Sequence, residues 1–409
     1  MRRFSLRSPL TFSLASLNFL ENPAPILEKM REAGAIIPLK IPMIGRIWVT
    51  TTYAATEDVM KGRTSFFLEG QSVGKSKSAQ MPWWIPKGMR LIAANMLNKD
   101  EPDHMRLRKL VDQAFRRQGI REMRPTIERK ALLVLNKAPP AEFDLIKHFA
   151  RTLPLETISD LLGVSAAHRD AFAHEAGKIS DVSSITKILG TLVALKRLIS
   201  LVRQLISEAR RNPQPGLLSE MLASRDGGDQ LSEDELIAMV FLLLFAGMET
   251  TTNLIAGSVW ALHQAPEQKA WLLADIENRR ETAVEELSRH VSSVTGSKPR
   301  YVGHDMQLHG QNLSRGERIM ALPIAANYDP SRFDNPAVLK LDRFPNPHLS
   351  YAAGIHFCLG LQLARIEVQA ALEVIYREFP NLTCSAPKYL KRPGSRTVKE
   401  MWIKTNQVT

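Results

Sequence analysis

Apolar residues recur at helical spacing along most of the 409-residue chain. This pattern predicts helices almost continuously over residues 101–211 and one long helix over 232–264. Strand patterns are confined to a hairpin over 36–52 and to short strands over 297–322. We therefore expect a mainly α-helical protein with a minor β component, of the α+β class.

The remaining segments show weaker patterns. A short helix is predicted over 25–34, and two further helices over 266–278 and 282–290. Residues 66–97 are rich in Gly, Ser, Pro and aromatic residues and lack periodicity, which predicts a long functional loop. Residues 327–346 are rich in proline and predict an irregular segment.

No repeat or linker divides the chain, so we expect an N-terminal arm over 1–21 and a single large domain over 22–409. The apolar patch over 10–20 is interrupted by polar residues and lacks a cleavage site, unlike a signal peptide. The longest uncharged apolar run, 236–248, is shorter than the roughly 20 residues of a membrane span. Two cysteines form no disulfide framework, and together these features predict a cytoplasmic protein.

The chain is basic, with a net charge of +12 and a pI near 9.7. Basic residues are not interleaved with aromatic ones, and no zinc-finger spacing is present, so we expect no nucleic-acid partner. Either a solvated basic surface or a docking face for an acidic protein accounts for the charge.

Cys358 is a candidate ligand because a helical pattern begins directly after it. Free amides and the dipole at a helix N-terminus favour a thiolate. Gly354 and Gly360 flank the cysteine and allow the backbone to approach a flat, bulky group. An axial haem ligand needs this setting, but a buried structural cysteine fits it equally well. Cys384 lies in a polar stretch near a proline and is interpreted as structural.

The middle of the long helix carries Ala246, Gly247, Glu249 and Thr250. The Thr250 hydroxyl can bond to the Ala246 carbonyl, which opens the helix where Gly247 leaves space. Such a groove suits a diatomic ligand, with Glu249 and Thr250 conducting protons. The alternative is a threonine-rich patch in an ordinary buried helix.

Two other pairs have helical spacing. Glu286 and Arg289 lie three residues apart and can form an ion pair, of a kind that is abundant on protein surfaces. His104 and Arg108 lie four residues apart on one helical face, which suits two carboxylates, a phosphate or solvent.

These segments together resemble the cytochrome P-450 superfamily of haem-thiolate monooxygenases over nearly the whole chain, residues 22–397. The stretch from Gly354 through His356, Cys358 and Gly360 resembles the haem-binding signature of the family. Residues 246–250 resemble its oxygen-binding motif. Glu286 and Arg289 resemble its core ion pair, with Arg343 as the third member.

The resemblance implies a role for each matching residue. Cys358 would be the thiolate ligand of the iron of haem b, with Gly360 beside it. Ala246 and Gly247 would lie against the haem, and Glu249 and Thr250 would deliver protons. The propionates would be held by His104, Arg108, Arg300 and His356. Glu286, Arg289 and Arg343 would form a buried structural network.

The implied function is that of a soluble, bacterial-type monooxygenase. It would use O2 to hydroxylate an apolar small molecule. Electrons would come from an acidic iron–sulfur ferredoxin with a NAD(P)H-dependent reductase, steered by Arg106, Arg108, Lys109, Arg116 and Arg117. Two alternatives are a haem-based gas or ligand sensor or carrier without turnover, and a peroxide-driven enzyme.

Two positions depart from the family pattern. Tyr351-Ala352 stands where Phe-Gly is usual, and alanine lacks the backbone freedom of glycine, so we expect an altered loop and redox poise. Tyr328 stands where arginine is usual, and we expect altered local salt bridges there.

The substrate pocket is expected to involve the loop 66–97, which corresponds to the most variable substrate-contacting region of the family. Trp83, Trp84 and Met89 would form an apolar wall, or the tryptophans would plug the core beneath the loop. Further wall residues would be Val240, Leu243, Leu244 and Val294.

Overall fold

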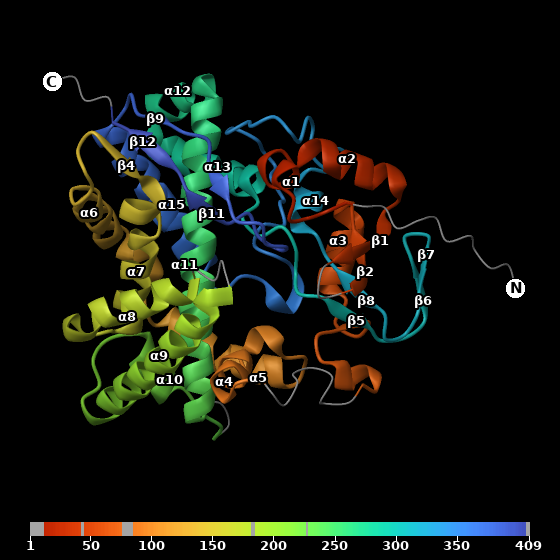
Figure 1. The fold of residues 1–409 in the computed structure, drawn as a ribbon, viewed down its shortest axis with the longest axis horizontal. Coiled ribbons are helices and arrows are strands. Elements are labelled where there is room, and N and C mark those ends of the chain that lie inside the picture. Colours follow the sequence, from red (N-terminus) through yellow and green to blue (C-terminus); the bar gives the residue numbers. More distant parts are fainter. Residues whose placement is uncertain (1–11, 42–44, 76–84, 181–184, 226–227, 406–409) are drawn as a thin grey trace, which may run out of the picture. The chain divides into compact units, whose positions relative to one another are not determined.

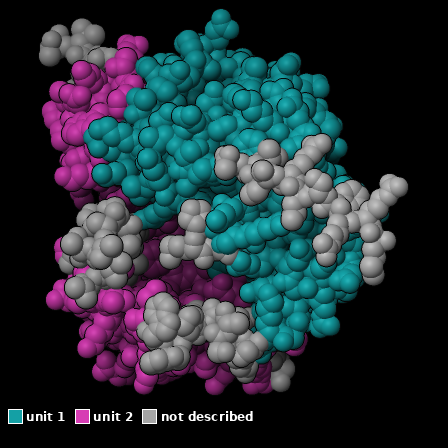
Figure 2. Space-filling view, turned by 45° about the vertical axis from the view of Figure 1, so that its right-hand side comes forward, with its two compact units in different colours: residues 1–80, 256–358, 386–401 teal, residues 81–255, 359–385, 402–409 magenta. Residues whose placement is uncertain are grey.

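The computed structural model describes residues 12–41, 45–75, 85–180, 185–225 and 228–405. The chain forms two compact units, which are coloured separately in Figure 2. Unit 1 contains residues 1–80, 256–358 and 386–401, and unit 2 contains residues 81–255, 359–385 and 402–409.

Unit 1 is built on a five-stranded sheet with the order β1-β2-β8-β5-β3. Its strands are β1 (Ile36–Ile41), β2 (Gly45–Thr50), β3 (Phe66–Phe67), β5 (Arg300–Val302) and β8 (Arg318–Met320). Strands β1 and β2 pair antiparallel with Ile36 opposite Thr50, whereas β2 and β8 are parallel. The unit also contains the hairpin of β6 (Met306–Leu308) with β7 (Gln311–Leu313), and the pair of β10 (Lys388–Tyr389) with β11 (Val398–Glu400).

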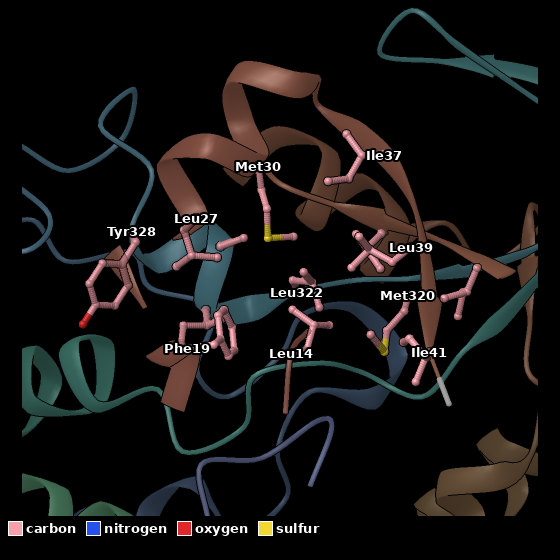
Figure 3. Packing of buried hydrophobic residues seen from close by; sticks show 14 of the residues in the cluster. Leu14, Phe19, Leu27, Met30, Ile37, Leu39, Ile41, Met320, Leu322 and Tyr328 are labelled. Atoms are coloured by element: carbon pink, nitrogen blue, oxygen red, sulfur yellow. The ribbon is translucent and has the colours of Figure 1, made fainter. Parts of the chain in front are cut away.

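The helices of unit 1 pack their apolar faces around this sheet. They are α1 (Leu17–Glu21), α2 (Ala24–Ala33), α3 (Tyr53–Lys61), α12 (Pro266–Ala274), α13 (Ile276–Val291) and α14 (Pro323–Asn327). Figure 3 shows Phe19, Leu27 and Met30 of α1 and α2 packed with Leu39 of β1 and Leu322. The arm at the N-terminus therefore contributes to the core, and a domain boundary at residue 21 stays a prediction.

Unit 2 is mainly helical (Figure 1). Its helices are α4 (Lys87–Ala93), α5 (Asp103–Arg116), α6 (Arg124–Leu135), α7 (Thr152–Leu162), α8 (Ala166–Ser180), α9 (Ile185–Arg211), α10 (Leu217–Ala223), most of α11 (Glu233–Gln264) and α15 (Leu361–Glu378). A small sheet joins β4 (Glu142–Asp144), β12 (Trp402–Lys404) and β9 (Thr383–Cys384).

Helix α11 is long and apolar because it is a core helix. By length and composition it could cross a membrane, and within the described part of the chain it is the one helix that meets this criterion. However, 61% of its most apolar window is buried inside the protein. The predicted capping box is present, because the Ser232 amide donates to Glu235 (2.9 Å) and the Glu235 amide donates back to Ser232 (3.3 Å).

The predicted fold class is confirmed, and so are the helix at α2 and the hairpin strands β1 and β2. The loop predicted over 66–97 is wrong in part, since it contains β3 and α4. The helical run over 101–211 is interrupted by β4, whose Phe143 pairs with Ile403 from the distant C-terminal segment. This pairing joins residues far apart in the sequence, which local periodicity cannot reveal.

The helices predicted over 266–278 and 282–290 have different boundaries. Helix α12 ends at Ala274, and α13 begins at Ile276, directly after Asp275. Asp275 is the N-cap residue of α13, and its side chain accepts hydrogen bonds from the Asn278 side chain (3.1 and 3.2 Å) instead of capping a backbone amide.

Candidate functional site

The loop before Cys358 has an unusual backbone that its sequence only partly favours. Gly354 has φ 73°, and an added Cβ there would lie 2.7 Å from the Met60 carbonyl oxygen, so the position requires glycine. Ala352 has φ 61°, in the left-handed region that alanine adopts only at a cost. The Cys358 amide donates to the Tyr351 carbonyl (3.0 Å) and closes the loop.

Helix α15 begins at Leu361, three residues after Cys358, as the sequence predicts. Gly360 occupies the N-cap position and, having no side chain, cannot itself cap the free amides of the first turn. An added Cβ at Gly360 would meet nothing within 4 Å, so there is open space beside the cysteine loop. A half-buried thiol before a helix N-terminus, next to open space, fits the ligand of a flat cofactor.

Cys384 has a different setting, because it lies in strand β9 opposite Ile403 of β12. It therefore precedes no helix and belongs to an ordered sheet. The two cysteines are thus distinguished by their local structure.

Arg300 lies close to the cysteine loop within unit 1. Its buried guanidinium donates to the carbonyls of Val59 (2.9 Å) and Met60 (3.1 Å), near the end of α3. The same Met60 carbonyl lies against Gly354. His356 lies on the short helix η6 (Gly354–His356), so the structure brings Arg300 and the His356 segment to the same end of α3.

Glu286 is the centre of a fully buried ion-pair network in unit 1. Its carboxylate accepts two hydrogen bonds from Arg289 (both 2.7 Å) and one from Arg343 (3.0 Å). It also accepts from the Lys340 amide (3.0 Å) and from Asn346 (3.1 Å). Burial opposes its ionisation, but the hydrogen bonds and charge of Arg289 hold the pKa of Glu286 below its ordinary value.

This network holds the irregular segment 327–346. Arg289 donates to the carbonyls of Asn327 (2.7 Å) and Pro336 (2.8 Å), and Arg343 donates to that of Asp334 (2.9 Å). The segment has little regular structure of its own, so these bonds define its path. The structure therefore brings together Glu286 and Arg289, as their spacing predicts, and Arg343, as the resemblance implies.

Polar residues that the sequence analysis missed extend the network to the cysteine loop. Asn327 donates to the Ser350 hydroxyl (2.8 Å), which in turn donates to the Ser288 carbonyl (2.7 Å). The Tyr351 hydroxyl lies 3.0 Å from that of Ser288. The sequence offered one signal for this extension, the polar Asn327 directly after the apolar run 319–326. The structure shows that Asn327 is buried, so its amide needs hydrogen-bond partners.

Tyr328, which stands where the family usually has arginine, is an uncharged residue with its own hydrogen bond. Its hydroxyl donates to the His290 carbonyl (2.8 Å), and its ring lies 5.8 Å from the Arg289 guanidinium. Burial raises the pKa of Tyr328 and, together with the charge of Arg289, lowers that of His290 to about 3. Both groups are therefore neutral near pH 7, and the pairing of Arg289 with Glu286 is unaffected.

The predicted side-chain bond is present in the unit 2 part of α11, which stays a continuous helix over Glu233–Gln264. The Thr250 hydroxyl donates to the Ala246 carbonyl at 2.6 Å. Ala246 is exposed in this otherwise largely buried helix, and an added Cβ at Gly247 would meet only Ile158, at 3.9 Å. The half-buried Glu249 and Thr250 follow on the next turn. A core helix with one open face fits a cofactor and a small ligand held against it.

Glu367 of α15 is a buried acid that the sequence analysis did not single out. Burial raises its pKa to about 8, although hydrogen bonds from Thr157 and Thr251 act in the opposite direction. The acid therefore holds a proton near pH 7, beside the residue that follows Thr250. The signal in the sequence was a carboxylate on the apolar face of a helix, four residues after Leu363.

His104 and Arg108 both lie on α5 in unit 2, as their spacing predicts. His104 is buried, whereas Arg108 is partly exposed and pairs with Asp112 (3.2 Å). Their contact with carboxylates of a cofactor stays a prediction.

The predicted substrate-pocket residues are distributed over both units. Trp83 and Trp84 lie outside the described residues. Met89 is 40% exposed on α4, while Val240, Leu243 and Leu244 are buried in α11. Val294 belongs to unit 1, where it forms a bridge with Ser395. Their role in substrate binding stays a prediction.

Known proteins similar to this chain in sequence and in structure belong to one family. Residues 184–395 match the family model of cytochrome P450. The polyketide biosynthesis cytochrome P450 PksS of Bacillus subtilis is 33% identical, over 91% of this chain and 92% of that protein. Its solved structure has a TM-score of 0.86 at 31% identity, covering 97% of this chain and all of that one (100%).

Two further relatives carry named ligands or reactions. The vitamin D(3) 25-hydroxylase of Pseudonocardia autotrophica is 34% identical, over 90% of this chain and 89% of that enzyme. A cytochrome P450 of Bacillus megaterium, solved in complex with testosterone, has a TM-score of 0.82 at 26% identity, covering 94% and 99% of the two chains. This chain belongs to the cytochrome P450 family, whose members are haem-thiolate monooxygenases.

Proposed function

We propose that Cys358 is the haem ligand of this monooxygenase, which inserts one oxygen atom from O2 into an apolar molecule of about the size of a steroid. The observation that carries the proposal is the setting of Cys358, in a closed loop before a helix whose N-cap is glycine, with open space at Gly360. The ligand complex and hydroxylase activity named for two relatives support the size and class of the substrate.

Haem ligated by a thiolate supplies the activation of O2 with two electrons. The residues of this chain position it and control protons. His104, Arg108, Arg300 and His356 would pair with its carboxylates, because cationic and hydrogen-bonding side chains suit the two propionates.

Thr250 and Glu249 would carry protons to the oxygen site. The Thr250 hydroxyl donates its own proton to the Ala246 carbonyl, so its oxygen can accept a hydrogen bond from a neighbouring donor. Glu249 lies next to it and is partly exposed, which allows exchange of protons with solvent.

An acidic iron–sulfur ferredoxin, reduced by a NAD(P)H-dependent reductase, is the proposed electron donor of this cytoplasmic protein. Three of the basic residues expected to steer it already have acidic partners within the chain. Arg106 pairs with Asp229 and Glu235, Arg108 with Asp112, and Arg117 with Glu220. Steering would therefore depend mainly on Arg116, which is exposed on α5, together with the net charge of +12.

Turnover under ¹⁸O2 with a surrogate ferredoxin and its reductase tests the function. Testosterone and vitamin D3 are suitable first substrates, since relatives bind or are named for them. We expect one labelled oxygen atom in the product. Label-free product with added peroxide would indicate a peroxide-driven enzyme, and a spectral response without product would indicate a sensor or carrier.

A matched pair of variants tests the proton role. Thr250→Ala should keep substrate binding but divert electrons to hydrogen peroxide. Thr252→Ala is the control, because Thr252 makes the same type of bond to the Met248 carbonyl (2.8 Å) but is buried. Equal coupling of electrons to product in the two variants would contradict the role of Thr250.

A further inference from the structure

A cavity of about 920 Å³ lies within unit 2. Its walls come from the C-terminal end of α7, from α9 and from the start of α10. Val240 of α11 contributes to its lining, and it is the only one of the candidate site residues that does so among those the structure describes. Cavities of this size hold small-molecule ligands in other proteins.

The rim of the cavity is fixed by a close backbone contact. Gly163 caps α7 with φ 78°, and Gly216 precedes α10. An added Cβ at Gly216 would lie 2.8 Å from the Gly163 Cα atom, so the two chain segments touch without side chains. This contact joins the end of α7 to the start of α10 beside the cavity wall formed by Gly163 and Pro215.

The lining combines an apolar surface with balanced charges. The buried side chains of Leu162, Val202, Leu205 and Leu218 line it. Its acids are Asp160 and Glu208, and its cations are Arg169 and Arg211.

Asp160 is already compensated, since it lies 2.5 Å from Arg169 and 2.6 Å from Lys130. Glu208 accepts a hydrogen bond from Gln204 (3.1 Å). A charged ligand would upset this balance, whereas an uncharged one would gain apolar contacts and hydrogen bonds from the rim.

We propose that this cavity is a second binding site for an uncharged, apolar molecule that carries hydroxyl or carbonyl oxygens, and that its occupancy affects the oxygen-binding segment of α11. The ligand belongs to the same chemical class as the substrate, so this inference rests on the proposed function.

Helix α7 provides the link to α11. Asp160 and Leu162 line the cavity, while Ile158, one turn earlier in α7, lies against Gly247 of α11. On the same helix Thr157 shares the carboxyl of Glu367 with Thr251. A ligand that moves the end of α7 would therefore change the packing next to Thr250. Such coupling requires that the ligand bind with different affinity to the protein before and after the end of α7 moves.

Equilibrium dialysis of the haem-loaded protein with labelled testosterone, corticosterone and vitamin D3 tests the proposal, alongside a spectral titration of the haem. Ala209→Trp would fill the cavity from α9, and Ser219→Trp would fill it from α10. Ser200→Trp is the control, because Ser200 is exposed on the same helix α9 and does not line the cavity.

With at least one probe, we expect two molecules bound per protein and a sigmoidal spectral titration for the wild type and Ser200→Trp. The two filling variants should bind one molecule, with a hyperbolic titration. No molecule bound to the wild type with any probe, a single molecule that both filling variants still bind, two molecules bound to the filling variants, or a hyperbolic haem titration in all proteins would overturn the proposal.

The two proposals fail in different ways. A normal haem response with one molecule bound would refute the second site and leave the monooxygenase function intact. No haem response, with one molecule bound and lost in both filling variants, would refute the substrate class proposed for the haem site and retain this cavity as a ligand site.

Discussion

Ala352, six residues before Cys358, adopts a strained backbone conformation. Its φ of 61° lies in the left-handed region, where glycine is usual, and the sequence already indicated the absence of glycine here. The φ value of the loop could not be predicted from periodicity, because it follows from the closure of the loop by Cys358 and Tyr351.

We expect Ala352→Gly to raise the free energy of unfolding by about 1 kcal/mol, since glycine removes the left-handed strain. Urea denaturation followed by circular dichroism measures it. The neighbouring Ala353 has φ −147° and is buried, so Ala353→Gly should lower stability instead. Destabilisation by both substitutions would contradict the assigned strain at Ala352.

Glu367 makes stability depend on pH. Its folded pKa of about 8 lies above the usual 4.5, so the folded protein binds a proton that the unfolded chain releases. The stability present below about pH 4.5 is therefore lost progressively as pH rises to about 8. Glu367→Gln should remove this loss, and it should be more stable than the wild type by over about 1 kcal/mol at pH 8. Parallel stability curves between pH 5 and 8 would refute the buried neutral acid.

At the scale of elements, patterns within one segment were predictable and pairings between distant segments were not. The cap of α11 and the bond from Thr250 to Ala246 both follow from residues three or four apart. Strand β4 depends on β12, more than 250 residues later, and was missed. The segment 327–346 was predicted as irregular, but its anchoring carbonyls could not be identified from sequence.

The network of Glu286 holds that segment, so its loss should be severe. We expect Glu286→Gln to lower the free energy of unfolding by about 3 kcal/mol, because Arg289 would keep a buried charge without its partner. Thermal denaturation and the haem content after purification are the measurements.

Glu285→Gln is the matched control. Glu285 is adjacent and partly exposed, with His348 as its partner at 3.3 Å. Its substitution should change stability by less than about 1 kcal/mol. Similar losses in both variants would show that the network does not hold the segment.

At the scale of the whole molecule, the fold class could be predicted because helical periodicity covers most of the chain. The net charge of +12 could also be read from the sequence, but the ion pairs between distant charged side chains could not. The ion pairs of Arg106 with Asp229 and of Arg117 with Glu220 join side chains more than 100 residues apart, which only the folded chain brings together.

Reduction by an acidic ferredoxin should slow steeply with ionic strength, since salt screens steering between separate proteins. Stopped-flow measurements compare the wild type with Arg116→Glu and with Lys137→Glu, which changes the net charge equally at an exposed position outside α5. Arg116→Glu should be slower by several-fold at low salt. A flat salt dependence, or equal rates in the two variants, would contradict a docking face on α5.

Ligation of the haem iron by Cys358 can be measured in the absorption spectrum of the reduced carbon monoxide complex, because a thiolate ligand shifts the main haem band to longer wavelength. The wild type and Cys384→Ser should show the shifted band, and Cys358→Ser should lose it. A shifted band that survives in Cys358→Ser, or disappears in Cys384→Ser, would show that Cys358 is not the ligand.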